Sequence, residues 1–314
     1  MKPSLSRGER AGVRGDMFNS VTGLIEFETF LVGDSDRWLF VDVPHGATRK
    51  ADYDAVFAQL KGALPSQLEH FFFVNTDIGA PEGAQYLGRT LSKQGINVVF
   101  ARCLIPRTFI DPNRVVVLSA PGGVVKDGLT AAVPAYIKNA DDLAWLGAQH
   151  ARYHAEVDKT YRFICGEKKG LAVQLHSYSP RSVGIEVVDE NIVNALHAAY
   201  VPEVYATWPE RPVVDLISAT KDGSFRTAPK LVDALLAEYA RDGIPAKENA
   251  TYHLAPAAMG MVYAEQYPQQ VFCVELNRGN VADPFVPFGE SPISPAKIEK
   301  MVAPIARVVA MELK

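Results

Sequence analysis

Three residues of this sequence, His45, Asp77 and His176, together have the side chains of a catalytic zinc site. Two imidazoles and one carboxylate can bind Zn2+ and leave a fourth coordination position open. Bound zinc lowers the pKa of a water molecule to about 7, so a nearby carboxylate can take its proton and direct the hydroxide at a carbonyl. Glu275 is the candidate for this base. Alternatively, each histidine is a structural residue at a strand end, and Glu275 pairs with Arg278 on the surface.

A second group of polar residues lies within eight positions, in the stretch "IPRTFIDPNR". Polar groups are costly to bury unless they are paired, so this group needs either internal partners or a ligand. An arginine beside an asparagine suits a substrate carboxylate, and we expect Asn113 and Arg114 to bind one. A second arginine, Arg107, can stabilise an oxyanion as its charge develops. In the alternative, Asp111 pairs with one of these arginines to brace a turn.

The elements that must position these residues are short β-rich runs that alternate with longer helical patterns. This alternation predicts a three-layer α/β/α fold with a central mixed, mostly parallel sheet. Capping residues mark several helix ends, because Gly95 and Gly243 follow helical segments and Ser294 precedes Pro295. The expected strands are residues 38–43, 70–75, 96–103, 170–176 and 270–276. The expected helices are residues 51–64, 81–95, 139–164, 228–243 and 294–313.

The strand ends explain how polar residues far apart in the sequence could meet. Open α/β sheets bind ligands at the carboxyl ends of their strands. The two histidines, Asp77 and the arginine-rich stretch each follow or end an expected strand, and Glu275 lies inside the last one. We therefore expect these residues at one edge of the sheet. Tyr178, two residues after His176, is expected to line the substrate pocket.

One further histidine pair lies on the helix expected over residues 139–164. His150 and His154 are four residues apart, so both would lie on one face of that helix. Ala151 follows the first of them, where the metalloprotease motif has a glutamate. The pair either supports the substrate pocket or packs as an ordinary helix face.

Composition limits the classes of function. The chain has 314 residues, of which 48% are hydrophobic, and this suits one large α/β domain or two smaller ones. We expect a single domain over residues 21–314 and a disordered leader over residues 1–20, with Met17 as an alternative start. The net charge is -4 and no basic run is interleaved with aromatic residues, so nucleic acid is not an expected partner. No apolar run approaches the roughly 20 residues of a membrane span.

The cysteines suggest a compartment. Cys103, Cys165 and Cys273 are far apart in the sequence, and each lies beside apolar residues. This pattern is typical of buried thiols in a reducing environment. We therefore expect a cytoplasmic protein. Its expected partner, from the arginine-rich stretch described above, is a small molecule that carries a carboxylate.

Five segments carry a resemblance to a known family. In chain order they are "VPHG" (43–46), "TDIGAPEGAQYL" (76–87), "RTFIDPNR" (107–114), "QLHSYSP" (174–180) and "VFCVELNR" (271–278). Together they resemble the N-formylglutamate amidohydrolase family, over about residues 40–310. That family is similar in fold and chemistry to zinc carboxypeptidases and succinylglutamate desuccinylases.

The resemblance implies a zinc-dependent hydrolase with one Zn2+ per chain. Such an enzyme would cleave the amide of an N-acyl amino acid, and N-formylglutamate would yield formate and glutamate. The roles that the resemblance implies agree with those inferred above: His45, Asp77 and His176 as metal ligands, Asn113 and Arg114 as the carboxylate-binding pair, Arg107 as the oxyanion or substrate arginine, and Glu275 as the general base.

The chain also departs from the pattern of these families. Gly46 and Ala47 follow the first histidine, where the family usually has Ser-Gly, and Thr48 stands where carboxypeptidases have a glutamate. The third metal ligand must then come from elsewhere, and Asp77 has Asp52 as its rival. "HSYSP" in place of the usual "HSM" indicates a remodelled pocket. Two alternatives therefore stay open: a carboxypeptidase-like or desuccinylase-like deacylase of different specificity, and a metal-free binding or regulatory protein.

Overall fold

The computed structural model describes residues 17–116, 124–125, 129–185 and 187–314. Residues 1–16 of the expected leader lie outside the described residues. Phe18, close to the first described residue, is buried, and its ring packs edge-on against Phe163.

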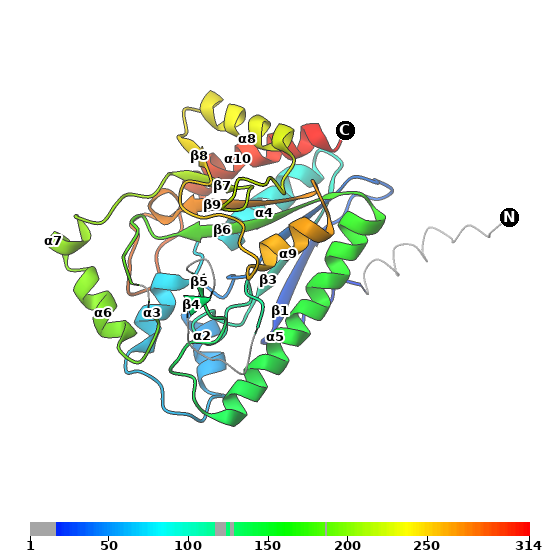
Figure 1. The fold of residues 1–314 in the computed structure, drawn as a ribbon. Coiled ribbons are helices and arrows are strands. Elements are labelled where there is room, and N and C mark those ends of the chain that lie inside the picture. Colours follow the sequence, from blue (N-terminus) through cyan, green and yellow to red (C-terminus); the bar gives the residue numbers. More distant parts are fainter. Residues whose placement is uncertain (1–16, 117–123, 126–128, 186) are drawn as a thin grey trace.

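A seven-stranded mixed sheet forms the centre of the molecule (Figure 1). The strand order is β1-β3-β2-β6-β9-β7-β8. The pairs β2·β3, β2·β6, β6·β9 and β7·β8 are parallel, and β1·β3 and β7·β9 are antiparallel. The strands are β1 (Ile25–Phe30), β2 (Trp38–Val43), β3 (Asn97–Cys103), β6 (Leu171–Tyr178), β7 (Val214–Ile217), β8 (Ala246–Glu248) and β9 (Val271–Asn277). A separate pair joins β4 (Val124–Val125) to β5 (Leu129–Thr130).

Helices cover both faces of the sheet, as Figure 1 shows. On one side α4, α8 and α10 pack on the sheet, and on the other side lie α5 and α9, with α2 and α3 near the strand ends. The helices are α2 (Lys50–Phe57), α3 (Leu68–Asn75), α4 (Ala80–Ser92), α5 (Ala140–Tyr161), α6 (Ile192–Ala199), α7 (Pro202–Tyr205), α8 (Pro229–Arg241), α9 (Met259–Gln266) and α10 (Pro295–Glu312), with a π-helix η2 (Arg162–Glu167) and a 3-10 turn η3 (Arg278–Asn280). The predicted fold class is confirmed. Among the described residues, no helix is long and apolar enough to cross a membrane.

Strand β2 illustrates why the sequence forms a covered sheet. All six of its residues are buried, because a parallel strand between two helical layers needs apolar side chains on both faces. Leu39, Val41 and Val43 face the core under α4 and α10. Trp38 and Phe40 face the opposite core, where the ring of Phe40 meets Tyr161 of α5 edge-on.

Asp42 is the polar member of β2, and it joins that strand to α5. Its buried carboxylate accepts hydrogen bonds from Tyr153 Oη (3.1 Å), Tyr161 Oη (3.2 Å) and Gln174 Nε2 (2.9 Å). Burial raises the pKa of this carboxyl group, although the three donors oppose the shift. Because both tyrosines belong to α5, the carboxylate fixes the long helix to the middle of the sheet.

Helix ends follow the predicted capping residues. Gly95 and Gly243 have φ angles of 77° and 66°, in the left-handed region that glycine adopts without steric cost. The side chain of Ser294 accepts a hydrogen bond from the backbone N–H of Lys297 at the start of α10. The predicted ends at Gly243 of α8 and Ser294 of α10 are confirmed, whereas α4 ends at Ser92 and Gly95 lies two residues beyond its C-cap, Lys93.

One expected strand is wrong. Residues 70–75 belong to helix α3, not to a strand, so Asp77 follows a helix. The error has a physical reason: a short apolar run is buried in either structure, and periodicity alone does not distinguish a strand from a buried helix. The chain enters α3 through Gln67 in the left-handed conformation, and Phe71, Phe72 and Phe73 are all buried.

Other elements were not expected. Between the expected strand over residues 170–176 and the expected helix over residues 228–243, the chain forms α7 and β7. The edge strands β1 and β8 were also missed, as were α6 and α9. Strands β7 and β8 have only four and three residues, too short for an alternating pattern to stand out.

Gly79 sets how closely α4 approaches the segment after β9. Its φ is +82°, and an added Cβ would lie 2.7 Å from Val281 Cγ2. Gly223 offers a matched control, because its φ is +84° but nothing lies within 4 Å of the Cβ position. We expect Gly79→Ala to lower the free energy of unfolding by about 1 to 3 kcal/mol more than Gly223→Ala, since only the first adds overpacking to backbone strain. Urea denaturation of both variants measures this difference, and equal losses would contradict it.

Candidate functional site

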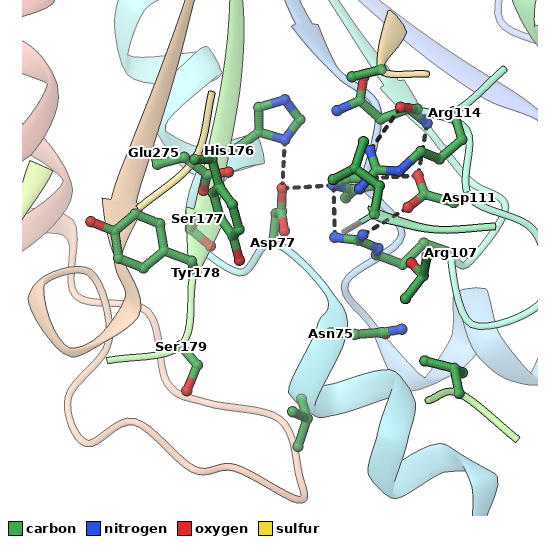
Figure 2. A pocket seen from close by; sticks show the side chains of 18 of the residues that line it. Asn75, Asp77, Arg107, Asp111, Arg114, His176, Ser177, Tyr178, Ser179 and Glu275 are labelled. Carbon is green, nitrogen blue, oxygen red and sulfur yellow. Dashed lines mark hydrogen bonds and ion pairs between the residues drawn. The ribbon is translucent and has the colours of Figure 1, made fainter. Parts of the chain in front are cut away.

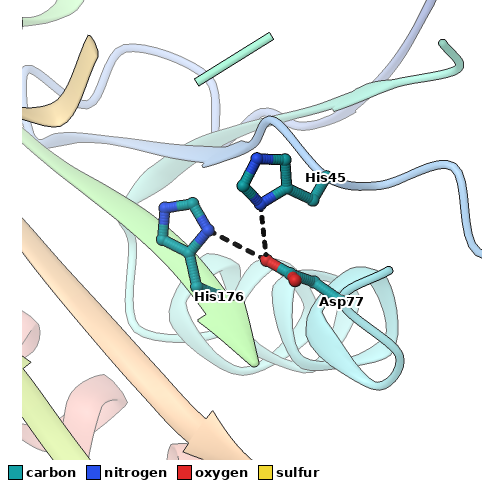
Figure 3. A group of neighbouring side chains, drawn as sticks. All are labelled: His45, Asp77 and His176. Atoms are coloured by element: carbon teal, nitrogen blue, oxygen red, sulfur yellow. Dashed lines mark hydrogen bonds and ion pairs between the residues drawn. The ribbon is translucent and has the colours of Figure 1, made fainter. Parts of the chain in front are cut away.

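The structure brings His45, Asp77 and His176 together at one end of the sheet (Figure 3). Asp77 Oδ2 lies 3.1 Å from His45 Nδ1 and 2.9 Å from His176 Nδ1. All three side chains are buried, and one possible ligand atom from each lies within 4.8 Å of the others. This His-Asp-His cluster could bind a metal ion.

Each member of the cluster comes from a different segment. His45 lies in the turn after β2, where Gly46 packs so closely on Arg102 that an added Cβ would lie 2.5 Å from Arg102 Cβ. Asp77 lies between α3 and α4, and its backbone N–H donates to the carbonyl of His45 (3.4 Å). His176 is on β6, which is the parallel neighbour of β2. The ends of two adjacent strands thus meet the loop that precedes α4.

Arg278 supports Asp77 from behind. Its Nη2 lies 3.4 Å from Asp77 Oδ1 and donates to the carbonyl of Ser177 (3.0 Å), and its Nη1 donates to the carbonyl of Val74. Burial raises the pKa of Asp77, but the two neighbouring imidazoles outweigh it and hold this pKa below its usual range. The sequence alternative placed Arg278 on the surface beside Glu275. Instead, Arg278 is buried and pairs with Asp77.

Asp111 fixes the orientation of His45. Asp111 Oδ1 lies 2.8 Å from His45 Nε2 and accepts a hydrogen bond from the backbone N–H of Asn113 (2.8 Å), while Oδ2 accepts from Arg107 Nη2 (2.7 Å). Burial raises the pKa of Asp111, but Arg107 and His45 hold it well below its ordinary value. The expected turn-bracing pair of Asp111 with an arginine is therefore present. Because Nε2 of His45 is engaged by a carboxylate, its Nδ1 faces Asp77, as in histidines that bind metals.

Asp52, the rival third ligand, lies outside the cluster. Its Oδ2 accepts hydrogen bonds from the backbone N–H groups of Thr48 and Arg49, both at 3.1 Å, at the start of α2. Arg102 Nη1 lies 3.6 Å from the same oxygen. The structure thus places Asp77 with the histidines and gives Asp52 a helix-capping position.

Glu275 lies beside the cluster on the next strand. β6 and β9 are parallel, and Glu275 is the register partner of His176. Its Oε2 is buried, with no hydrogen-bond partner in the described part of the chain. Burial and the charge of Asp77 raise the pKa of Glu275 to about 7, although His176 opposes the shift. A carboxylate with an unpaired oxygen and a pKa near neutrality suits a general base.

Asn113 and Arg114, the candidates for binding a substrate carboxylate, line one pocket together with the His-Asp-His cluster. Arg114 Nη1 donates to the carbonyl of Asn113 (2.9 Å), and Arg114 Nε is buried without a partner among the described residues. Asn113 Oδ1 accepts from the backbone N–H of Gly260 (3.3 Å). Arg107, which also lines the pocket, places Nη1 3.4 Å from His45 Nδ1. Figure 2 shows Arg107, Asp111 and Arg114 grouped on one side of Asp77.

The pocket has a volume of about 590 Å³ and includes the His-Asp-His cluster, Glu275 and the arginines. Tyr178 lines it as expected, but its hydroxyl donates to the carbonyl of Pro212 (2.7 Å), so the ring contributes to the wall and the hydroxyl is occupied. Arg211, Tyr252 and Arg278 are among the lining residues that the sequence did not predict. Arg278 ends the quoted "VFCVELNR" segment, which was a usable signal, whereas Arg211 and Tyr252 lie in stretches without any motif.

Comparison with known proteins gives the fold. No protein-family model and no curated protein sequence matches the chain. Among solved structures, N-formylglutamate amidohydrolase from Ralstonia eutropha JMP134 has a TM-score of 0.58 at 17% identity, covering 91% of this chain and 96% of its own. A gene product from Agrobacterium tumefaciens has a TM-score of 0.55 at 14% identity, covering 92% of this chain and 95% of its own. At these identities the likeness establishes a shared fold.

The histidine pair of α5 packs against the turn that carries Asn113. His150 Nε2 lies 3.0 Å from the carbonyl oxygen of Arg114, and His154 Nε2 lies 2.9 Å from that of Pro112. His154 Nδ1 also contacts Tyr263 Oη at 3.2 Å. The pair therefore supports the pocket from behind, through the backbone of this turn. Burial lowers the pKa of both imidazoles to about 4.

These two histidines predict a pH dependence of stability. Unfolded imidazoles, with a pKa of about 6.5, take up protons as the pH falls below 7, whereas the folded ones stay neutral until about pH 4. Protonation therefore favours the unfolded state, and stability decreases as the pH falls through this range. We expect the pair to account for about 2 to 3 kcal/mol of lost stability between pH 7.5 and 5.5. Urea unfolding at both pH values, compared with the His150→Gln/His154→Gln variant, measures it; an unchanged slope in the variant would refute the assignment.

Proposed function

We propose that the chain is a zinc-dependent amidohydrolase that cleaves the amide of an N-acyl amino acid, such as N-formylglutamate. The observation that carries the proposal is the buried His45, Asp77 and His176 cluster in one pocket with the unpaired carboxylate oxygen of Glu275. The likeness in fold to an N-formylglutamate amidohydrolase supports the same reaction class. Arg114, whose Nε has no partner among the described residues, supports a substrate that carries a carboxylate.

The cluster fits a zinc ion by its donor set. Two imidazole nitrogens and one carboxylate oxygen are ordinary zinc ligands, and three protein ligands leave one position open. Asp111 on the far nitrogen of His45 is the kind of partner that orients a metal-binding histidine. His45, Asp77 and His176 would hold the ion, which when bound would polarise the carbonyl and acidify a water molecule.

The chain's own residues would carry the remaining steps. Glu275 Oε2 has no competing hydrogen bond among the described residues, so it is available to take a proton from water. As the water oxygen bonds to the acyl carbon and the carbon–nitrogen bond breaks, the same carboxyl group can return this proton to the leaving nitrogen. Arg107, next to His45 Nδ1, would stabilise the negative charge that develops on the acyl oxygen. Asn113 and Arg114 would hold the carboxylate of the amino acid.

Metal content gives the first test. Protein purified without a chelator or a histidine tag is expected to contain about one zinc ion per chain, and His45→Ala and His176→Ala are expected to lose it. Asp52→Asn is the matched control, because Asp52 caps α2 and should leave the zinc content unchanged. Elemental analysis measures all four proteins. Folded wild-type protein that takes up no zinc would refute the metal site and favour a binding protein.

The general base gives the second test. We expect Glu275→Gln to keep its zinc but to lower kcat for N-formylglutamate hydrolysis by at least roughly 10²-fold, because the amide cannot accept the proton. Glu265→Gln is the control, since Glu265 is an exposed acid of α9 that pairs with Arg226. Release of free amino acid measures turnover. Full activity in Glu275→Gln would assign the proton transfer to another group.

A further inference from the structure

Arg211 lines the pocket with part of its guanidinium group unused. Its Nε donates to Ser182 Oγ (3.0 Å), and its two terminal nitrogens make no hydrogen bond or ion pair with any described residue. Glu275, which lines the same pocket, is close enough for the charge of Arg211 to lower its pKa. Two parallel N–H groups on a free guanidinium edge match the two oxygens of a carboxylate.

Arg211 is held in place on several sides. Its guanidinium carbon lies 5.1 Å from the ring centre of Tyr178 and 5.4 Å from that of Tyr252. The two rings are nearly perpendicular, with their centres 6.5 Å apart. Tyr178 is fixed by the hydrogen bond from its hydroxyl to Pro212, the residue next to Arg211. A cation restrained by two aromatic rings loses little side-chain freedom when it binds an anion.

The other arginines of the pocket are engaged, with one exception. Arg107 pairs with Asp111, and Arg278 pairs with Asp77. Arg181 pairs with Glu210 and donates to the carbonyl of Trp208. Among the described pocket residues, this leaves Arg114 and Arg211 as the arginines without a carboxylate partner.

Arg114 and Arg211 lie in different parts of the pocket. In Figure 2, Arg114 and Tyr178 are on opposite sides of Asp77. Arg211 stacks on Tyr178, so it belongs to the side away from Arg114. In that view Asp77 of the candidate metal cluster lies between Arg114 and Tyr178.

We infer that Arg211 binds a second carboxylate of the substrate, on the side of the cluster opposite Arg114. The inference rests on the proposed function and names its substrate class: an amide that carries two carboxylates. The second carboxylate could belong to the side chain of the amino acid, as in N-formylglutamate, or to the acyl group, as in N-succinylalanine. Tyr178 acts through Arg211 as a positioning residue.

The test compares three amides on zinc-loaded protein: N-formylalanine with one carboxylate, N-formylglutamate with two on the amino-acid side, and N-succinylalanine with one on each side. We expect Arg211→Gln to raise KM for the preferred two-carboxylate amide by about tenfold or more, because a hydrogen-bonded charge pair is lost. KM for N-formylalanine, which has no second carboxylate, should change by no more than about twofold. Whichever two-carboxylate amide loses more identifies the source of the second carboxylate.

Two further variants sharpen the comparison. Arg211→Lys keeps the charge but lacks the planar edge, so it should recover only part of the loss. Arg162→Gln removes the same charge from an exposed position outside the pocket and should leave all three amides unaffected. A fall in kcat for all three amides in Arg211→Gln, with KM unchanged for both two-carboxylate amides, would overturn the inference, because Arg211 would then act only through Glu275.

Calorimetric binding of the same three amides separates this inference from the proposed function. The titrations use zinc-loaded protein with Glu275→Gln, so that hydrolysis does not interfere. If no amide is hydrolysed by the wild-type protein but Arg211→Gln selectively weakens binding of a two-carboxylate amide, the proposed function fails and the inference stands. If the amides bind alike and Arg211→Gln changes none of them, the inference fails whether or not hydrolysis is observed.

Discussion

The buried carboxylate of Asp77 is the interaction on which the rest of the site depends. A charge in a protein interior is tolerated only when it is paired and hydrogen-bonded. Asp77 meets this requirement with His45, His176 and Arg278, which come from the turn after β2, from β6 and from the turn after β9. One charge therefore draws three segments onto the loop that precedes α4. A divalent cation between Asp77 and the two imidazoles would satisfy the same requirement.

Glu275 differs from the other two acids of the candidate site. Asp77 and Asp111 are each compensated by neighbouring positive or donor groups, whereas one oxygen of Glu275 has no partner among the described residues. Natural proteins break the rule of satisfied buried polar groups mainly at functional sites. Within the part of the chain that the structure describes, Arg114 Nε and the terminal nitrogens of Arg211 also lack partners. In the proposed enzyme, the pocket would therefore combine one base with two groups able to bind an anionic substrate.

The centre of the fold was predictable from the sequence, and so was the meeting of two histidines at the candidate site. The strands now called β2, β3, β6 and β9 were expected within one or two residues, because parallel strands buried on both faces have continuous apolar runs. His45 and His176 followed from those strands. Asp77 was predicted at the end of a strand over residues 70–75, but these residues form helix α3. The loop after α3 still brings Asp77 to His45 and His176, so the prediction for this residue is unaffected. Arg211 was not found, because its role depends on two tyrosines, 33 and 41 residues away along the chain, that only the folded structure brings together.

The carboxylate of Asp42 connects the sheet to the helix that supports the turn with Asn113 and Arg114. The candidate metal ligands belong to the sheet and its loops, whereas the turn with Asn113 and Arg114 rests on α5 through His150 and His154. In the proposed enzyme, the distance between the amide to be cleaved and the carboxylate held by Asn113 and Arg114 would therefore depend on the position of α5 relative to the sheet. Asp42, bonded to Tyr153 and Tyr161, holds that helix at one tilt. A small shift of α5 would change this distance. Substitutions in the core under this helix could therefore change the length of substrate that the proposed enzyme accepts, while every residue that touches the substrate is retained.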